Sequence, residues 1–227
     1  MRLEAGFSVR AAAPAAIAES ETADRIWAEA RSDRPGLFDG KVFVADRVSP
    51  DHVSGYWTRY RFLYAQLRHP ELFPPPHLRA LAVNGVLHCR DGIVLGRRGP
   101  DAVYRPGCWQ AVPAGSVEAR TSDAVDITEQ LMAELEEEIG LVADETGPVT
   151  PIVAMEHPGG RVVDIGCFVA TSLPFAAIEH GWRDRGNTEY DALRVIASSE
   201  IPAFLRECGP ELLGSARILL SYASGGI

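Results

Sequence analysis

Three glutamates near the middle of the chain have the spacing of a metal-binding cluster. Glu134, Glu137 and Glu138 would lie on neighbouring turns of one helix, on a single face. Like charges repel at this spacing, and the C-terminal end of a helix disfavours anions further. Mg²⁺ or Mn²⁺ would relieve the repulsion, since both prefer carboxylate oxygen and keep positions open for a phosphate. A solvated acidic face that binds no metal is the alternative.

The helix that would carry these glutamates is predicted to run from Asp126 to near Gly140. Asp126 followed three residues later by Glu129 forms a capping-box pattern, and Gly140 lacks the Cβ that opposes a left-handed C-terminal cap. An apolar stripe at i+4 spacing would anchor another face of the helix and comprises Leu131, Leu135 and Ile139.

The segment from Gly115 to Leu141 resembles the Nudix box, whose pattern is G-x5-E-x7-R-E-U-x-E-E-x-G-U, with U an aliphatic residue. The second half of the pattern matches in register at Glu134, Leu135, Glu137, Glu138, Gly140 and Leu141. Gly115 and Glu118 look like the family's glycine loop and the additional glutamate that often follows it. The resemblance covers roughly residues 79–205 and implies a mixed β-sheet sandwiched between helices.

The sequence departs from the Nudix pattern at three points. Ala133 occupies the position of the box arginine, so the ion pair that orients a catalytic glutamate is absent or replaced. The interval from Glu118 to Glu134 is longer than the common family spacing. The first box glutamate would fall near Val125, with Asp123 and Asp126 nearby. Metal binding should survive these changes better than full catalytic efficiency does.

The resemblance implies a hydrolase of phosphorus-containing anhydrides that depends on Mg²⁺ or Mn²⁺. The expected reaction cleaves a nucleoside diphosphate linked to another group, giving a nucleoside monophosphate and a phosphorylated product. The expected metal ligands are Glu134, Glu137, Glu138 and Glu118. Ala133 and the stretched box favour the alternative, a weak or inactive Nudix-like module that binds a nucleotide or metabolite. A structural α/β protein with an incidental acidic helix is a third interpretation.

The N-terminal part carries a second resemblance. The long connection before the helix, together with Leu37, Phe38, Asp39, Gly40 and Lys41, is similar to the Nudix subgroup that hydrolyses UDP-sugars. This similarity ranks nucleoside diphosphate sugars first among substrates. The oligomeric state is open; many Nudix proteins dimerise, and in a homodimer the N-terminal region could supply an exchange surface.

The catalytic carboxylates are expected among Glu137, Glu138 and Glu189. Glu138 could act as general base if metal does not occupy it fully. Glu189 lies just before the last predicted strand, a location from which some Nudix enzymes supply this base. Geometry must choose between them, and a plain surface role for Glu189 is equally open.

Basic and aromatic residues around two predicted strands could bind substrate. Arg97 and Arg98 directly follow one strand, and Arg105 precedes Trp109. Arginine suits phosphate because its planar group can donate two hydrogen bonds at once. Ordinary solubilising charge is the alternative for each arginine. Trp109 or Tyr104 could stack on a base, although Trp109 also fits strand packing.

The elements that must position these residues divide the chain after residue 78. Residues 1–78 are predicted as an accessory α+β region with strands at 7–10 and 41–45 and helices at 21–30 and 60–67. The aromatic stripe of the second helix favours packing over ligand recognition. Residues 74–76 are prolines and form a stiff connector to the hydrolase domain, predicted for residues 79–227.

The second part has the alternation of strands and helices that indicates a mixed α/β fold. Strands are predicted at 81–89, 93–96, 109–112, 149–155, 162–170 and 192–197, and helices at 126–140, 201–207 and 211–223. Two pairs of these strands would form hairpins, the second of them around Pro158, Gly159 and Gly160. His88 and His157 lie on or beside strands without a second histidine at ligand spacing, which favours structural roles.

Composition limits the possible partners. The chain has 227 residues, 46% of them hydrophobic, and a net charge of −9. An acidic surface opposes binding to a nucleic-acid backbone, whereas divalent cations can link carboxylates to a small nucleotide. Residues 1–20 are too short and too weakly apolar to cross a membrane. The four cysteines form no CxxC pair, so we expect reduced thiols and a cytoplasmic location.

Overall fold

A computed structural model describes residues 1–12, 20–120, 124–156 and 161–225. Asp123, named above beside the first box position, lies outside these residues. So do His157 and the predicted hairpin turn at Pro158, Gly159 and Gly160.

The sheet is built around strand β4, Ala80–Cys89, which is buried along nearly its whole length. It pairs in parallel with β9, Val162–Ala170, and antiparallel with β5, Gly92–Arg98, and β7, Ala114–Ser116. Three further strands extend the sheet: β8, Thr150–Glu156, on β9, and both β6, Trp109–Ala111, and β10, Tyr190–Ile196, on β5. A strand buried on both faces needs helices on both sides of the sheet.

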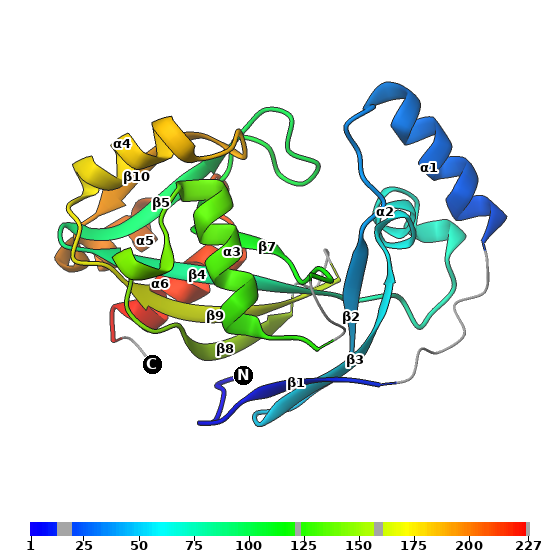
Figure 1. Ribbon diagram of the computed structural model, residues 1–227, viewed down its shortest axis with the longest axis horizontal. Helices are drawn as coiled ribbons and strands as arrows, with labels where there is room; N and C mark the ends of the chain where they lie inside the picture. Colours follow the sequence, from blue (N-terminus) through cyan, green and yellow to red (C-terminus); the bar gives the residue numbers. More distant parts are fainter. Residues whose placement is uncertain (13–19, 121–123, 157–160, 226–227) are drawn as a thin grey trace.

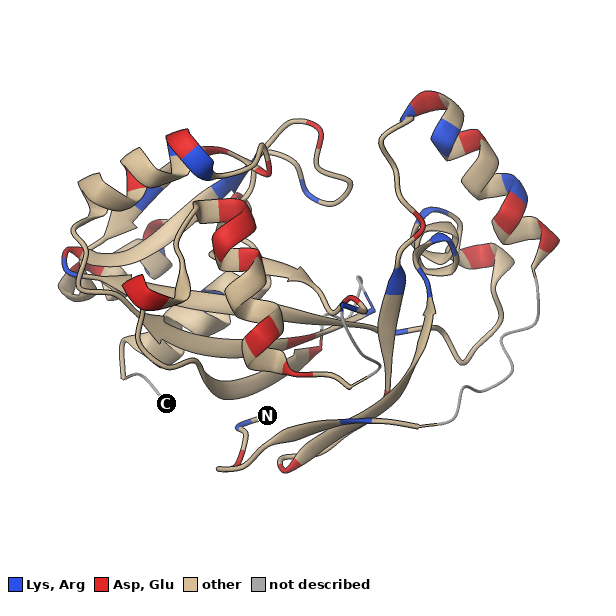
Figure 2. Cartoon of the chain, viewed as in Figure 1, with Lys and Arg blue, Asp and Glu red and all other residues tan. Residues whose placement is uncertain are grey.

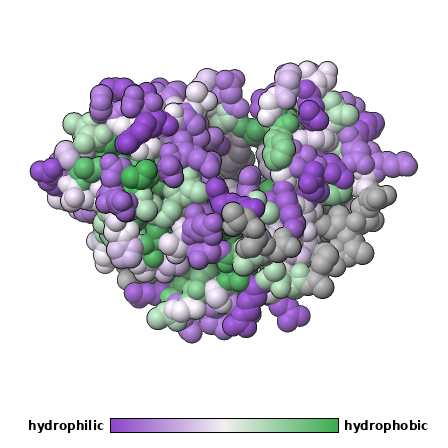
Figure 3. Space-filling view, in the orientation of Figure 1, coloured by the Kyte–Doolittle hydropathy of each residue, from purple (hydrophilic) through white to green (hydrophobic). Residues whose placement is uncertain are grey.

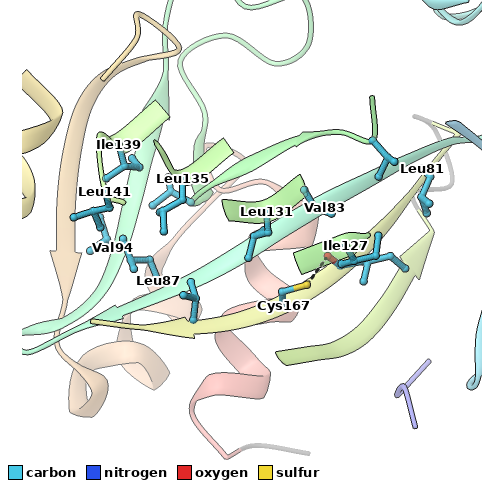
Figure 4. Close-up of a cluster of buried hydrophobic side chains, with 14 of the residues drawn as sticks. Leu81, Val83, Leu87, Val94, Ile127, Leu131, Leu135, Ile139, Leu141 and Cys167 are labelled. Atoms are coloured by element: carbon cyan, nitrogen blue, oxygen red, sulfur yellow. Dashed lines mark hydrogen bonds between the residues drawn. The ribbon is translucent and has the colours of Figure 1, made fainter. Parts of the chain in front are cut away.

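Helices cover both faces of this sheet (Figure 1). On one face lie α3, Ile127–Ile139, and α4, Phe175–Arg185; on the other lie α5, Ile201–Glu207, and α6, Gly214–Ala223. Figure 4 shows Leu131, Leu135 and Ile139 of α3 pointing onto the sheet residues of the first core. The expected mixed sheet between helices is therefore confirmed.

The N-terminal strands belong to the same ten-stranded sheet of the described residues. They are β1, Ser8–Ala11, β2, Lys41–Val48, and β3, His52–Arg59. β2 pairs with β4 at Val44 and Ala80. Phe43 N–H also donates to Val117 O at 2.9 Å, and Ala119 N–H donates to Lys41 O at 2.9 Å. The N-terminal part is thus tied by its backbone to the segment around residue 118.

Helices α1, Glu21–Asp33, and α2, Tyr60–Arg68, pack on each other beyond these strands. The Trp27 ring meets Tyr60 and Tyr64 edge-on, with centroids 5.9 and 5.5 Å apart. The prediction that the aromatic stripe packs is right for Tyr64, which is buried. Leu67, the last residue of the apolar face predicted for this helix, is 39% exposed.

Three elements were missed in the sequence: β3, β7 and α4. Gly55 interrupts the apolar pattern of β3, yet a Cβ there would overlap the carbonyl of Val44 on the paired strand, so the close approach requires glycine. β7 is only three residues long. α4 buries only Ile178 and Gly181, which leaves almost no helical periodicity to detect. Throughout the ranges given above, no helix is long and apolar enough to cross a membrane.

Candidate active site

Helix α3 has the ends that its sequence predicts. Asp126 caps the N-terminus, where its Oδ1 accepts hydrogen bonds from Thr128 N–H at 2.8 Å and from Glu129 N–H at 3.1 Å. Gly140 closes the helix with φ of +76°, a conformation that disfavours side chains with a Cβ. These caps fix the rotation of the helix, and its apolar stripe is fully buried.

The three glutamates of α3 have three different environments. Glu138 is only 3% exposed, whereas the side chain of Glu134 is 14% exposed and that of Glu137 is 58% exposed. Burial raises the pKa of Glu134 to about 7, and the negative charge of Glu137 adds to the rise. Burial also raises the pKa of Glu138 well above its usual range. The helix therefore holds carboxylates whose negative charge is not fully compensated.

Glu138 is held by two donors on one of its oxygens. Ala114 N–H donates to Oε2 at 3.0 Å and the Tyr190 hydroxyl donates to the same atom at 2.8 Å. Oε1 is left without a hydrogen-bond partner in the described structure. The sequence offered one signal for Tyr190, its position directly after Glu189, which the prediction did not use.

A chain of hydrogen bonds leads from Glu138 to Glu189. Gln110 Nε2 donates to the Tyr190 hydroxyl at 2.8 Å, and Arg98 Nη1 donates to Gln110 Oε1 at 2.9 Å. Arg98 Nη2 lies 3.1 Å from Glu189 Oε1. Strands β5, β6 and β10 thus hold two of the three predicted catalytic carboxylates in one network, since each strand supplies one of the linking side chains.

Glu134 lies against the glycine loop. A Cβ on Gly115 would overlap the Glu134 carboxylate, so glycine is the residue that allows this approach. Gln130 Nε2 donates to Glu134 Oε1 at 2.6 Å, and Gln130 Oε1 accepts from Glu118 N–H at 3.2 Å. Gln130 therefore connects two of the predicted metal ligands, a role that sequence spacing did not reveal.

Arg120, from the long connection before α3, pairs with two of the helix glutamates. Its guanidinium lies 3.4 Å from Glu137 Oε1 and 3.9 Å from Glu134 Oε1. Ala133, at the position of the box arginine, has no charged group and cannot form such a pair. Arg120 is therefore paired with Glu134 and Glu137 and not with Glu138.

The four predicted metal ligands all offer carboxylate oxygens, but these oxygens are not grouped around a common centre. Across the described ranges, no three acidic, histidine or cysteine side chains are grouped as they would be around an ion. Glu138 is engaged by Tyr190, Glu134 by Gln130 and Glu137 by Arg120. The carboxylate oxygens fit the ligand preference of Mg²⁺ and Mn²⁺, and the raised pKa values show that a cation would be favourable there.

The carboxylates line a cleft of about 1190 Å³ between the sheet and helix α2. Figure 2 shows acidic residues along α3 beside the space that separates it from α1 and α2, and Figure 3 shows a hollow at this place on the surface. The residues that line it include four glutamates and two tyrosines of α2: Glu118, Glu134, Glu137, Glu138, Tyr60 and Tyr64. The cleft is large enough for a nucleotide.

Some predicted site residues line this cleft and others do not. Arg98, Glu189 and Tyr104 line it together with the four glutamates. Arg97, Arg105 and Trp109 are not among its lining residues. Arg97 instead pairs with Asp191 at 2.6 Å and lies over the Trp109 ring, 5.9 Å from its centroid. Adjacent residues of a strand face opposite ways, which is why Arg97 and Arg98 are separated.

His88 and the cysteines lie in places that fit structural roles. His88 Nε2 lies 3.3 Å from the Ser198 hydroxyl, outside the cleft. All four cysteines are free, and Cys89 and Cys167 are buried.

No family model matches this sequence, and no curated protein matches it either. Solved structures are similar to it in fold. The protein DR0079 of Deinococcus radiodurans has a TM-score of 0.50 at 14% identity, covering 81% of this chain and 98% of that one. The MutT protein of Methanosarcina mazei Go1 has a TM-score of 0.45 at 14% identity, covering 65% and 94%. A NUDIX-family hydrolase of Clostridium perfringens has a TM-score of 0.43 at 13% identity, covering 65% and 97%.

The similarity to DR0079 shows that the chain shares the mixed α/β fold of that structure. Identities of this size show the fold alone, so the chemistry must be argued from the cleft.

Proposed function

We propose that the protein is a metal-dependent pyrophosphohydrolase that cleaves a nucleoside diphosphate linked to another group. The products would be a nucleoside monophosphate and a phosphorylated second product. The observation that carries the proposal is that Glu118, Glu134, Glu137 and Glu138 all line one nucleotide-sized cleft. The match of α3 to the second half of the Nudix box supports the same activity.

Glu118, Glu134, Glu137 and Glu138 would hold the metal through carboxylate oxygens. Bound Mg²⁺ or Mn²⁺ would neutralise diphosphate charge and lower the pKa of the attacking water. For ligation, Glu134 and Glu137 can each use Oε2, because Gln130 and Arg120 engage only their Oε1 atoms, and Glu138 can use its unpartnered Oε1. Arg120 lines the same cleft and could donate to the phosphates, for which its planar group is suited.

The proton of the attacking water requires an acceptor in the same cleft. Glu138 can take it only if Oε1 does not serve as a ligand, because Oε2 already accepts from Ala114 and Tyr190. Glu189 is the second choice and is held in the cleft by Arg98. Arg98 donates to Tyr104 O and Gln110 as well, so its main role is to position Glu189 and the network behind Glu138.

Nucleoside diphosphate sugars are the preferred substrates within this class. The long connection between Gly115 and Glu134 and the segment from Leu37 to Lys41 support this choice through their resemblance to the UDP-sugar hydrolases. Tyr60 and Tyr64, the residues of α2 that line the cleft, would contact either the base or the second group of the substrate. Sedimentation would show whether the protein is a monomer or the homodimer that many Nudix proteins form.

The proposal is tested with a substrate panel of nucleoside diphosphate sugars, ADP-ribose, dinucleotides and nucleoside triphosphates, each with Mg²⁺ or Mn²⁺ and with EDTA. Turnover of at least one diphosphate-linked compound, abolished by EDTA, is expected. Glu138→Gln should lower kcat by about a hundredfold or more, the range typical of an acid–base or ligand group. Glu136→Gln on the exposed side of the same helix is the matched control and should retain activity.

A second measurement does not depend on turnover. Millimolar Mn²⁺ should raise the melting temperature of the wild-type protein, because ligands that bind only the folded state stabilise it. Glu134→Gln should reduce this rise. Tight nucleotide binding without any turnover would instead establish a binding module, and an unchanged Glu138→Gln enzyme would reject the ligand assignment.

A further inference from the structure

Asp164 is a buried acid in the cleft that the proposed hydrolysis does not use. It lies on β9, is 8% exposed and lines the same cleft as the four glutamates. No side chain or backbone group of the described residues forms a hydrogen bond or ion pair with its carboxylate, which is open only to the cleft. A buried carboxylate without a partner is costly, so its presence in a cleft points to a ligand.

The surroundings of Asp164 offer no compensating charge. Burial raises its pKa to about 6, and no basic side chain opposes the rise. Near neutral pH the group is therefore mostly ionised and can act only as a hydrogen-bond acceptor. Its neighbours on this part of the cleft are polar as well: Asn84 and Ser215 are buried, and Asn84 Nδ2 donates to the Ser215 hydroxyl at 3.3 Å.

The sheet register relates this acid to the segment that carries Glu118. Asp164 on β9 is aligned with Ala82 on β4, and Ala82 is aligned with Ser116 on β7, so about two strand spacings, roughly 10 Å, separate the backbones of Asp164 and Ser116. Side chains alternate along a strand, and both neighbours of Asp164 pack in the core under α3, so Asp164 points to the opposite face of the sheet. The cleft is lined by Asp164 as well as by the four glutamates, so a nucleotide held there by its diphosphate can extend its nucleoside end toward Asp164.

We infer that Asp164 recognises the nucleoside end of the ligand by accepting two adjacent hydrogen-bond donors. A carboxylate has two oxygens in one plane and can accept such a pair in parallel. Two parts of a nucleotide present paired donors: the edge of guanine, through its ring N–H and amino group, and the vicinal hydroxyls of ribose. This inference rests on the proposed function for the identity of the ligand as a nucleotide, and it adds a specificity residue to that site.

Binding without metal tests the inference apart from catalysis. Calorimetry in EDTA would compare GMP with IMP, which lacks only the amino group, and with 2′-deoxy-GMP, which lacks only one hydroxyl; AMP and UMP complete the set. In the wild-type protein, loss of one of these two groups from the ligand, either the amino group or the hydroxyl, should weaken binding about tenfold, the size expected for a hydrogen bond to a charged group. If IMP binds more weakly than GMP, Asp164 accepts from the guanine edge. If 2′-deoxy-GMP binds more weakly, Asp164 accepts from the ribose.

Asp164→Asn supplies the second half of the comparison. The substituted side chain has nearly the same shape but loses one acceptor and its charge, so it should weaken the preferred ligand about tenfold and remove the difference between the paired ligands. Asp191→Asn, outside the cleft and paired with Arg97, is the matched control and should bind as the wild type does.

Equal binding of all five nucleotides by the wild type, no measurable binding, or an unchanged preference in Asp164→Asn would each overturn the inference. The outcomes also separate it from the proposed hydrolysis. If the protein turns over a substrate but binds the paired nucleotides equally, only the recognition role of Asp164 is rejected. If it distinguishes the paired nucleotides through Asp164 but turns over no substrate, only the hydrolase proposal is rejected.

Discussion

The Tyr190 hydroxyl donates a 2.8 Å hydrogen bond to Oε2 of Glu138, and both side chains are buried. Tyr190 in turn accepts a hydrogen bond from Gln110, so a single hydroxyl links the helix carboxylate to the network that ends at Glu189. This bond favours the charged form of Glu138 and opposes the effect of burial on its pKa.

Tyr190→Phe removes that donor with little change of shape. The pKa of Glu138 should rise further, so the acidic limb of the pH profile of kcat should move to higher pH. The free energy of unfolding should fall by about 1–3 kcal/mol, because Gln110 loses its acceptor in a buried place. Stopped-time assays across pH and urea denaturation measure both effects. Tyr56→Phe, on β3 outside the cleft, is the control, and an identical shift in it would show that the effect is not local.

Gly115→Ala should separate stability from activity. The added methyl group would meet the carboxylate end of Glu134, which can move, so the free energy of unfolding should fall by only about 1 kcal/mol, at the low end for an added methyl group. Displacing that carboxylate should still lower turnover by about tenfold to a hundredfold. Gly36→Ala is the control, since nothing lies near its added methyl group. Wild-type turnover by Gly115→Ala would mean that the position of Glu134 is unimportant.

Two adjacent arginines should differ in importance. Arg98→Met removes the partner of Glu189 and of Gln110 and should lower kcat/KM by about tenfold, the effect of a lost charged hydrogen bond. Arg97→Met removes an exposed pair with Asp191 and should change kcat/KM by less than about twofold. Steady-state kinetics of both variants on the same substrate measure this difference. An equal loss of kcat/KM in Arg97→Met and Arg98→Met would contradict the placement of the cleft on one side of β5.

Asp164 should make stability depend on pH in a characteristic direction. Its pKa is raised from 3.8 to about 6 in the folded protein, so the folded chain holds this proton more tightly than the unfolded chain. The contribution of Asp164 is therefore most favourable below about pH 4 and is lost as pH rises through about 6. Asp164→Asn should be more stable than the wild type by about 3 kcal/mol above pH 7, and the gap should close near pH 4. Urea denaturation at several pH values measures this gap; a gap that is constant with pH would be the contrary result.

The helix with the glutamates was the most predictable part of the molecule. Asp126 and Gly140 act through local backbone geometry, and Leu131, Leu135 and Ile139 through a simple period, so nearby residues suffice to place α3. The environments of Glu134, Glu137 and Glu138 could not be predicted in this way. Tyr190 reaches Glu138 from a strand 52 positions later, and such a contact has no local signal.

The substrate-binding predictions show the same limit. Arg98 and Arg97 look equivalent in the sequence, but strand alternation and the partners on β6 and β10 place them in different surroundings. Arg120 was not singled out because its pairing with Glu137 depends on the path of the connection before α3. Asp164 lies in an otherwise apolar strand, and only the packed sheet shows that it faces the cleft.

The backbone bonds from Lys41 and Phe43 to residues 117–119 limit how far the protein can be trimmed. A shortened chain that starts at residue 79 would expose the edge that carries Glu118 and would delete Tyr60 and Tyr64 from the lining of the cleft. Such a fragment would present an open acidic surface instead of a cleft. Any minimal version made for crystallisation or engineering should therefore keep the first two helices and the strands between them.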